Sequence, residues 1–240
     1  MSETERVTEA EAIGTRLAEL ARHDRKVNRE LVKALGDSGL FEPVFAADGV
    51  TAADLCATRQ GLARSNTAAE TAFALQGLGG TPIHLAGTES ARADWVPSLR
   101  AGDVIAAFAL TEPGAGSDAA ALATVAERDG DGFRITGEKA YISNAPEADV
   151  YTVFASSEPG SGSRGVTAFV VPGDTEGLSG EPIDLIAPHP IGRLRFDGVF
   201  APASSVLGEV NQGFGVAMQT LDLFRPSVGA FALGMAEAAL

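Results

Sequence analysis

The 240-residue sequence contains a single cysteine, Cys56, and only three histidines. One thiol excludes an internal disulfide and any metal site built from several cysteines, and it fits a reducing cytosol. The histidines, His23, His84 and His189, lie far apart, with none of the close spacings of a local metal motif. We therefore expect packing or surface roles for them, and a cytoplasmic location for the protein.

Basic residues and long apolar runs are also scarce. Lys and Arg number 18 against 32 Asp and Glu, which leaves a formal net charge of −14. Such a chain repels nucleic acid and anionic membrane surfaces, so we expect neither as a partner. No stretch approaches the roughly 20 apolar residues of a membrane span, and the acidic start is unlike a signal peptide. The remaining composition, 45% hydrophobic and 21% charged, is that of a globular protein.

The character of the sequence changes near residue 103. Before it, apolar residues recur at helical spacing, which predicts helices over 6–22, 27–36, 51–63, 67–78 and 88–99. Beyond it, short apolar runs predict strands over 104–110, 123–127, 132–136, 139–143, 150–156, 166–171 and 194–200. The pattern returns to a helix over 213–240, which Pro226 is expected to kink or restart.

These patterns predict an α+β fold. An N-terminal all-α helical domain (1–102) precedes a small antiparallel β-barrel or sandwich domain (103–210), and 211–240 begins a C-terminal helical bundle. The segment 129–132 is typical of a hairpin turn, and 158–163 of a hairpin loop and not a domain linker. The last helix is still apolar at Leu240, so we expect a partner surface for it, from another subunit or from further residues.

The first segment that carries candidate chemistry is 108–118, Phe-Ala-Leu-Thr-Glu-Pro-Gly-Ala-Gly-Ser-Asp, where a strand enters a loop. Its glycines can present backbone N–H groups outward, and with Thr111 and Ser117 they could hold a phosphate or a polarised ring carbonyl. An ordinary tight turn capped by Ser117 or Asp118 has the same residues and is the commoner case locally. The loop lacks the lysine of a Walker loop and the second half of a dinucleotide fingerprint.

Two further segments have a functional and a structural interpretation. Tyr141 and Ser143 alternate on one strand and therefore point to one face, where they could stack on and bond to a flat heterocycle. An ordinary strand with one aromatic residue has the same pattern. Arg225 is a lone cation in an apolar helix and could bind an anionic group. An ion pair with Asp222, three residues earlier, is the alternative.

In combination these segments resemble the acyl-CoA dehydrogenase family over roughly residues 10 to 240. The Thr-Glu-Pro-Gly-Ala-Gly-Ser-Asp run at 111–118 is the most specific part. The resemblance continues in Leu99-Arg100-Ala101-Gly102, Gly137-Glu138-Lys139, Tyr141-Ile142-Ser143-Asn144, Leu194-Arg195-Phe196, Val206-Leu207-Gly208-Glu209, Gly213-Phe214 and Arg225-Pro226. It implies a helical domain, a central β domain and a C-terminal four-helix domain, with FAD between the β domain and the helices.

The resemblance also implies site residues. Thr111 corresponds to a contact with the isoalloxazine ring, and Gly116 and Ser117 to contacts on the pyrophosphate side. Tyr141 and Ser143 stand where the family usually has Trp and Thr. The full set of implied cofactor contacts is Phe108, Leu110, Thr111, Gly116, Ser117, Tyr141, Ile142 and Ser143, and the implied substrate contacts are Ser117, Asp222 and Arg225.

The implied reaction is α,β-dehydrogenation of an acyl thioester, on CoA or on an acyl carrier protein. A glutamate takes the α proton, and the β hydrogen passes as hydride to flavin N5. An electron acceptor such as an electron-transfer flavoprotein, and a homo- or hetero-oligomer, are implied as partners. The family's usual glutamate falls beyond Leu240, and the position that a minority of members use holds Phe224. No catalytic base is assigned.

Two alternatives to a dehydrogenase stay open. A flavin-dependent monooxygenase or oxidase has the same fold, but such relatives usually diverge in the Thr-Glu-Pro loop, which is intact here. A subunit that binds acyl thioesters or a partner without turnover fits the missing glutamate. The segment 187–192, Ala-Pro-His-Pro-Ile-Gly, replaces the family's usual polar run before the last strand, so substrate contacts there are not assigned.

Overall fold

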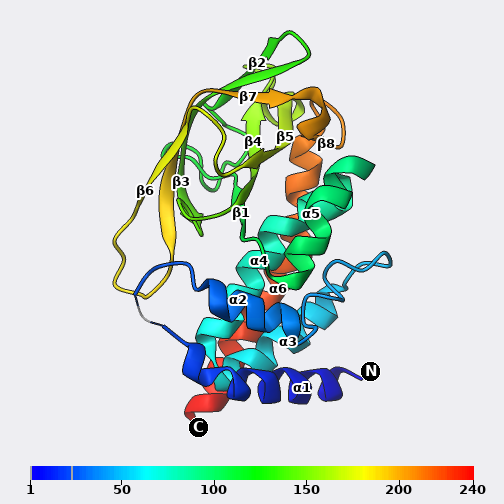
Figure 1. Ribbon diagram of the computed structural model, residues 1–240, viewed down its shortest axis with the longest axis vertical. Coiled ribbons are helices and arrows are strands. Elements are labelled where there is room, and N and C mark those ends of the chain that lie inside the picture. The colour runs from blue at the N-terminus through cyan, green and yellow to red at the C-terminus, as the bar shows by residue number, and fades with distance from the viewer. Residues whose placement is uncertain (1, 23) are drawn as a thin grey trace.

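The structure, a computed structural model, describes residues 2–22 and 24–240 (Figure 1). The helices are α1 (Glu3–Arg16), α2 (Arg29–Asp37), α3 (Ala52–Ser65), α4 (Thr67–Ala86), α5 (Glu89–Ala101) and α6 (Gly213–Ala239). The strands are β1 (Ala106–Ala109), β2 (Val125–Asp129), β3 (Gly132–Ser143), β4 (Val150–Ser156), β5 (Val166–Pro172), β6 (Leu178–Pro182), β7 (Ile191–Pro202) and β8 (Val206–Leu207). This order of helices, strands and a final helix confirms the predicted α+β fold.

The helices begin where the sequence supplies side-chain caps. Ser2 and Thr51 each form a capping box at the start of α1 and α3, and Thr88 caps α5. Asn66 ends α3 and caps α4, and its amide also donates to the Gly14 carbonyl of α1. The chain therefore turns sharply between two long helices with few unpaired backbone groups at the corner.

The strands form one sheet in the order β6-β7-β3-β2-β4-β5-β8, and β1 pairs with β4. Most neighbours are antiparallel, but β1 and β2 both run parallel to β4, which the sequence did not predict. Both predicted hairpins are present: Asp129 pairs with Gly132 between β2 and β3, and β4 pairs antiparallel with β5 around the loop at 157–165. The division of the chain into three domains stays a prediction.

Several predicted bounds are wrong for local physical reasons. The strands expected at 132–136 and 139–143 are one strand, β3, whose register against β7 shifts at two irregularities. The helix expected at 6–22 ends at Arg16, and a separate short 3-10 turn (Ala18–Leu20) follows. The strand β6 was not predicted, because its residues are mostly exposed and show no apolar alternation.

Helices α4 and α6 each continue through a proline, and Pro226 of α6 was expected to kink or restart its helix. α4 was predicted to end at 78 but continues to Ala86 with Pro82 inside it. α6 does not restart at Pro226. In each helix a neighbouring hydroxyl bonds to a carbonyl one turn back: Thr81 Oγ1 donates to the Gly77 carbonyl, and Ser227 Oγ to the Phe224 carbonyl. Neither bond reaches the carbonyl that the proline leaves without its N–H donor, which belongs to Leu78 in α4 and to Asp222 in α6.

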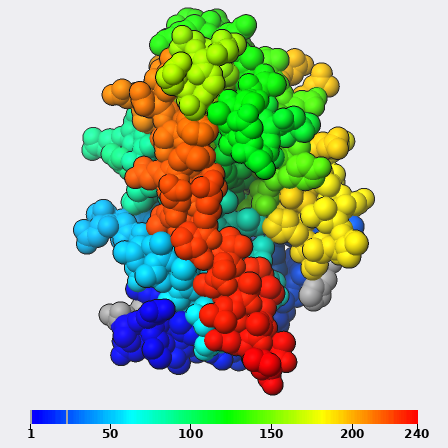
Figure 2. Space-filling model, turned by 180° about the vertical axis from the view of Figure 1, so that it is seen from behind, coloured from blue at the N-terminus to red at the C-terminus, as the bar shows by residue number. Residues whose placement is uncertain are grey.

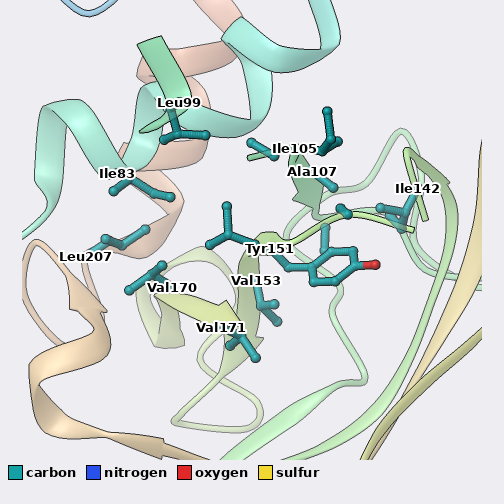
Figure 3. Close-up of a cluster of buried hydrophobic side chains, with 14 of the residues drawn as sticks. Ile83, Leu99, Ile105, Ala107, Ile142, Tyr151, Val153, Val170, Val171 and Leu207 are labelled. Atoms are coloured by element: carbon teal, nitrogen blue, oxygen red, sulfur yellow. The ribbon is translucent and has the colours of Figure 1, made fainter. Parts of the chain in front are cut away.

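One hydrophobic core joins the sheet to the helices (Figure 3). Side chains from α4, α5, β4 and β5 meet there, including Ile83, Leu99, Val153 and Val170. The buried Gln76 amide of α4 donates to the carbonyls of Leu99 and Val104 and accepts from the Ala106 N–H. These bonds fix the start of β1 against α4, and so fix the position of the loop that follows β1.

The helix α6 lies along the back of the molecule and reaches from the sheet to the N-terminal helices (Figure 2). At the N-terminal end of α6, a Cβ on Gly213 would clash with the backbone of Thr167 and Ala168 in β5. Toward the C-terminal end, a Cβ on Gly234 would clash with the backbone of Gln60 in α3. Glycine thus permits close contact at both ends. Among the described residues, neither α6 nor any other helix has the length and apolar character to cross a membrane.

Candidate active site

A cavity of about 300 Å³ lies where α4, β1, the loop after β1, β3 and α6 meet. It is lined by Leu75, Leu78, Ala107, Phe108, Leu110, Thr111, Gly116, Ser117, Ala119, Tyr141, Ser143, Leu221 and Arg225. The structure therefore brings the three predicted segments into one cavity, although they are far apart in the sequence. Arg225 is its only charged lining residue within the described part of the chain.

Two of the predicted site residues lie elsewhere. The Ile142 side chain is buried in the hydrophobic core (Figure 3), so only its backbone is available to a ligand. Asp222 does not line the cavity and pairs with Arg225, with 3.1 Å between Oδ1 and Nη1. The ion pair expected as the alternative for Arg225 is present, and the guanidinium also lines the cavity, so anion binding by Arg225 stays a prediction.

The loop that follows β1 is anchored by a buried ion pair that the sequence analysis missed. Lys139 of β3 is fully buried and donates to Glu112 Oε1 at 2.8 Å and to the Leu110 carbonyl at 3.0 Å. The two Glu112 oxygens also accept the backbone N–H groups of Ala123 and Thr124. The carboxylate thus holds both ends of the loop. The only signal of this ion pair in the sequence was a lysine at a position of the strand that is buried.

The charge states of this pair follow from its surroundings. Burial alone would raise the pKa of the Glu112 carboxyl, but the Lys139 ammonium and the two backbone donors outweigh it and lower that pKa. Burial also lowers the pKa of Lys139 to about 8, although the Glu112 carboxylate opposes that shift. Both groups are therefore ionised at neutral pH, and the loop is held by a charged interaction shielded from water.

Between its anchors the loop makes a tight turn. Glu112 and Ala115 exchange two backbone hydrogen bonds, and the Ala140 N–H of β3 donates to the Thr111 carbonyl. Within the described residues, the N–H groups of Gly116 and Ser117 donate to no protein acceptor. The turn interpretation and the ligand interpretation of this loop are thus compatible, because the turn leaves donors at the cavity free.

The end of β3 carries a solvent-exposed aromatic ring. Tyr141 has a φ of 59° and is 59% exposed, which is uncommon for a bulky aromatic residue. It lies at the second irregularity of β3, so regular alternation alone does not explain why Tyr141 and Ser143 share the cavity. Asn144 follows with a φ of 67° and donates to the Ala106 carbonyl of β1. Backbone strain of this kind concentrates at functional sites.

The histidines have the packing roles that were expected, within what the structure describes. His84 Nε2 lies 2.9 Å from the Ala46 carbonyl, and His189 Nε2 lies 2.8 Å from Ser143 Oγ. Burial lowers the pKa of both rings, so both are neutral at pH 7. No group of metal-ligating side chains gathers in the described part of the chain, and His23 lies outside it.

Comparisons with known proteins agree with the cavity. The model of the acyl-CoA dehydrogenase N-terminal domain matches residues 2–103, and that of the middle domain matches 107–199. The short-chain specific mitochondrial acyl-CoA dehydrogenase of Bos taurus is 44% identical over 162 residues, which cover 66% of this chain and 39% of that protein. The chain thus spans less than half the length of this curated relative.

Solved structures extend the likeness over the whole chain. Butyryl-CoA dehydrogenase from Megasphaera elsdenii has a TM-score of 0.88 and 31% identity, and the match covers 99% of this chain and 66% of that one. A glutaryl-CoA dehydrogenase from Mycobacterium smegmatis in complex with FADH2 has a TM-score of 0.87 and 28% identity, covering 99% of this chain and 63% of that one. The chain belongs to the acyl-CoA dehydrogenase family, whose members are flavoprotein oxidoreductases.

The cavity fits the FAD that this family implies. Free backbone donors at Gly116 and Ser117 and the hydroxyl of Thr111 suit the carbonyls and phosphates of a flavin nucleotide. The exposed Tyr141 ring offers a flat face, and no carboxylate lines the cavity within the described residues. A polyanionic nucleotide with a planar ring system therefore meets complementary groups and no repulsion from the cavity wall.

Proposed function

We propose that the cavity binds FAD together with the thioester end of an acyl substrate, and that the protein catalyses α,β-dehydrogenation of that substrate. The observation that carries this proposal is the convergence of the Thr-Glu-Pro loop, Tyr141, Ser143 and Arg225 on one cavity. When bound, the flavin supplies a two-electron acceptor for the hydride from the β carbon. The remaining steps depend on side chains and backbone groups of the protein.

The chain's own residues have three roles in this proposal. Thr111 and Ser143 hydrogen-bond the ring edge, and Tyr141 covers a ring face. The N–H groups of Gly116 and Ser117 bind phosphate or polarise a carbonyl oxygen, where fixed donors stabilise developing negative charge. Phe108 and the leucines of α4 exclude water from the ring. The Lys139–Glu112 pair holds the loop in place without touching the ligand.

The proton-abstracting carboxylate is proposed to come from outside the 240 residues. Phe224, at the alternative position for a base, is 5% exposed, and a Cβ on Gly77 would contact its ring. Of the nearby carboxylates, Glu112 is engaged by Lys139 and Asp222 by Arg225. Neither is placed to remove a proton from a ligand in the cavity, so we infer that another segment or subunit supplies the base.

Thr111→Val is expected to weaken FAD binding about five- to tenfold, because it removes one hydrogen-bonding hydroxyl and keeps the side-chain shape. Titration of the FAD-free protein, followed by quenching of flavin fluorescence, measures the effect. Thr175→Val is the matched control, since Thr175 is in a surface turn where its hydroxyl donates to the Pro172 carbonyl. Equal FAD affinity of Thr111→Val and the wild type would contradict the role of Thr111.

Arg225→Gln is expected to weaken binding of an acyl-CoA about two- to fivefold, with a smaller loss at high salt. The guanidinium is more than half exposed, so solvent and salt screen its attraction for a phosphate or carboxylate. Isothermal titration with butyryl-CoA at low and high ionic strength measures both effects. Arg195→Gln, an exposed change on β7 outside the cavity, is the control. A loss that does not depend on salt would argue against anion binding by Arg225.

One experiment separates catalysis from binding alone. The protein is purified together with the segment or subunit that supplies the base and is loaded with FAD, and butyryl-CoA is added without oxygen. Bleaching of the flavin band supports dehydrogenation, with an electron-transfer flavoprotein as the proposed acceptor of the electrons. A spectral shift without bleaching supports a non-catalytic thioester-binding subunit, which the lack of a carboxylate in the cavity favours as the second candidate. A protein that takes up no FAD would refute the proposal.

A further inference from the structure

A second cavity, also of about 300 Å³, lies behind the first. Its walls come from α2, α4, the end of α6 and the segment 187–190, and they include Leu31, Thr71, Phe231 and His189. Leu75 of α4 lines both cavities, so the two spaces lie back to back. His189 belongs to the segment 187–192, for which the sequence analysis assigned no substrate contacts.

A hydrogen bond joins a side chain of the first cavity wall to a side chain of the second. Ser143 Oγ, which lines the first cavity, lies 2.8 Å from Nε2 of His189, which lines the second. A serine hydroxyl rotates freely unless a partner fixes it, and it has one hydrogen to donate and two lone pairs. When Nε2–H donates to Oγ, the Ser143 hydrogen stays available for a ligand in the first cavity.

The backbone holds the imidazole in this position. His189 stands between Pro188 and Pro190, whose rings restrict the chain, and its N–H donates to the Ala187 carbonyl. The Pro190 carbonyl accepts the N–H of Asn144, the residue after Ser143. The segment 187–190 is thus bonded to the residue that follows Ser143, and its backbone places the His189 side chain beside the Ser143 hydroxyl.

We propose that His189 is a positioning residue of the FAD site, which orients the Ser143 hydroxyl toward the cofactor from the neighbouring cavity. The inference rests on the proposed function, because Ser143 is assigned to the cofactor there. His189 itself does not line the FAD cavity, so it acts only through Ser143. A serine in place of the family's usual threonine has no methyl group to restrict its hydroxyl, and the imidazole supplies that restriction.

The test measures FAD affinity of the FAD-free protein by fluorescence titration. His189→Phe, which keeps a ring but no nitrogen, is expected to weaken FAD binding about five- to tenfold. Ser143→Ala is expected to weaken FAD binding by a similar factor. The double variant is expected to bind FAD no more weakly than Ser143→Ala alone, because the two changes remove the same interaction. His84→Phe is the matched control, a half-buried histidine bonded to a carbonyl outside both cavities; its FAD affinity is expected to equal that of the wild type.

A second pair of variants keeps the inference testable if His189→Phe does not fold. His189→Gln can place an amide nitrogen near the position of Nε2 and is expected to retain FAD affinity, whereas the shorter His189→Asn is expected to lose it. The inference is overturned if the wild type binds FAD and His189→Phe binds it equally tightly. It is also overturned if the losses of FAD affinity caused by His189→Phe and by Ser143→Ala multiply in the double variant. If the wild type binds no FAD, the proposed function fails first, and the two failures are thereby distinguished.

Discussion

Replacing Lys139 by methionine is expected to lower the free energy of unfolding by about 3–5 kcal/mol, because it leaves the Glu112 carboxylate buried without its cation. The side chains are of similar length, so lost packing contributes little. Urea unfolding at pH 7 measures the change. The loop at 111–118 loses its anchor at the same time, and we expect FAD affinity to fall with the stability of the protein.

Two further variants separate charge burial from loop anchoring. Lys33→Met breaks exposed pairs with Asp37 and Asp103 and is expected to cost at most about 1 kcal/mol. The double change Glu112→Leu with Lys139→Met removes both buried charges, so part of the stability is expected to return. FAD affinity is not expected to return, since Glu112→Leu removes the carboxylate that accepts the N–H groups of Ala123 and Thr124. A Lys139→Met protein as stable as the wild type would contradict the buried pair.

Replacing Arg59, in the helical part of the molecule, by leucine is expected to lower the free energy of unfolding by a comparable amount, about 3–5 kcal/mol. Arg59 of α3 pairs with the buried Glu70 of α4, and its Nη1 donates to Ser227 Oγ of α6 at 2.7 Å. It is the only charged partner of Glu70 among the described residues. Without it, three helices lose a shared polar contact and one carboxylate is left in an apolar setting.

The loss of unfolding free energy caused by Arg59→Leu is expected to become smaller as the pH falls. Burial raises the pKa of Glu70 above its ordinary value, and Arg59 opposes that shift. Removing the arginine raises the pKa further, so the folded variant binds a proton more readily than the unfolded chain, and its stability is lost as pH rises. Urea unfolding at pH 5 and pH 7 checks the sign. Arg64→Leu, which breaks partly exposed pairs with Glu11 and Glu237, is the control and is expected to cost at most about 1 kcal/mol.

Where local chemistry decides the structure, the sequence predicts it well. The helix beginning after Thr51 and the hairpin at 129–132 depend on a cap and on turn residues, and both are present. The continuation of α4 to Ala86 was missed because glycines and Pro82 disfavour a helix locally, and packing against β1 and β4 overrides that preference. The edge strand β6 is held by backbone pairing with β7, which leaves no trace in the side-chain pattern.

The candidate site was predicted by resemblance more than by local pattern. Taken alone, the Thr111 loop and the Tyr141 strand looked like an ordinary turn and an ordinary strand, and only the folded chain brings them to one cavity with Arg225. The Lys139–Glu112 pair was missed because charged residues are almost always exposed unless they are paired, and sequence alone does not show the pairing. The contact between His189 and Ser143 was missed because it depends on the path of the segment at 183–190.

The helix α6 contributes to the cavity wall near its middle and is held in place at its two ends. Its 27 residues make a rod about 40 Å long, seated at both ends through glycine contacts against β5 and α3. Leu221 and Arg225 line the cavity between these two seats. Because both ends of α6 are held against other elements, the positions of Leu221 and Arg225 in the cavity wall depend on packing at the sheet and at the N-terminal helices. A substitution that loosens either contact is therefore expected to change the cavity wall as well as the stability of the fold.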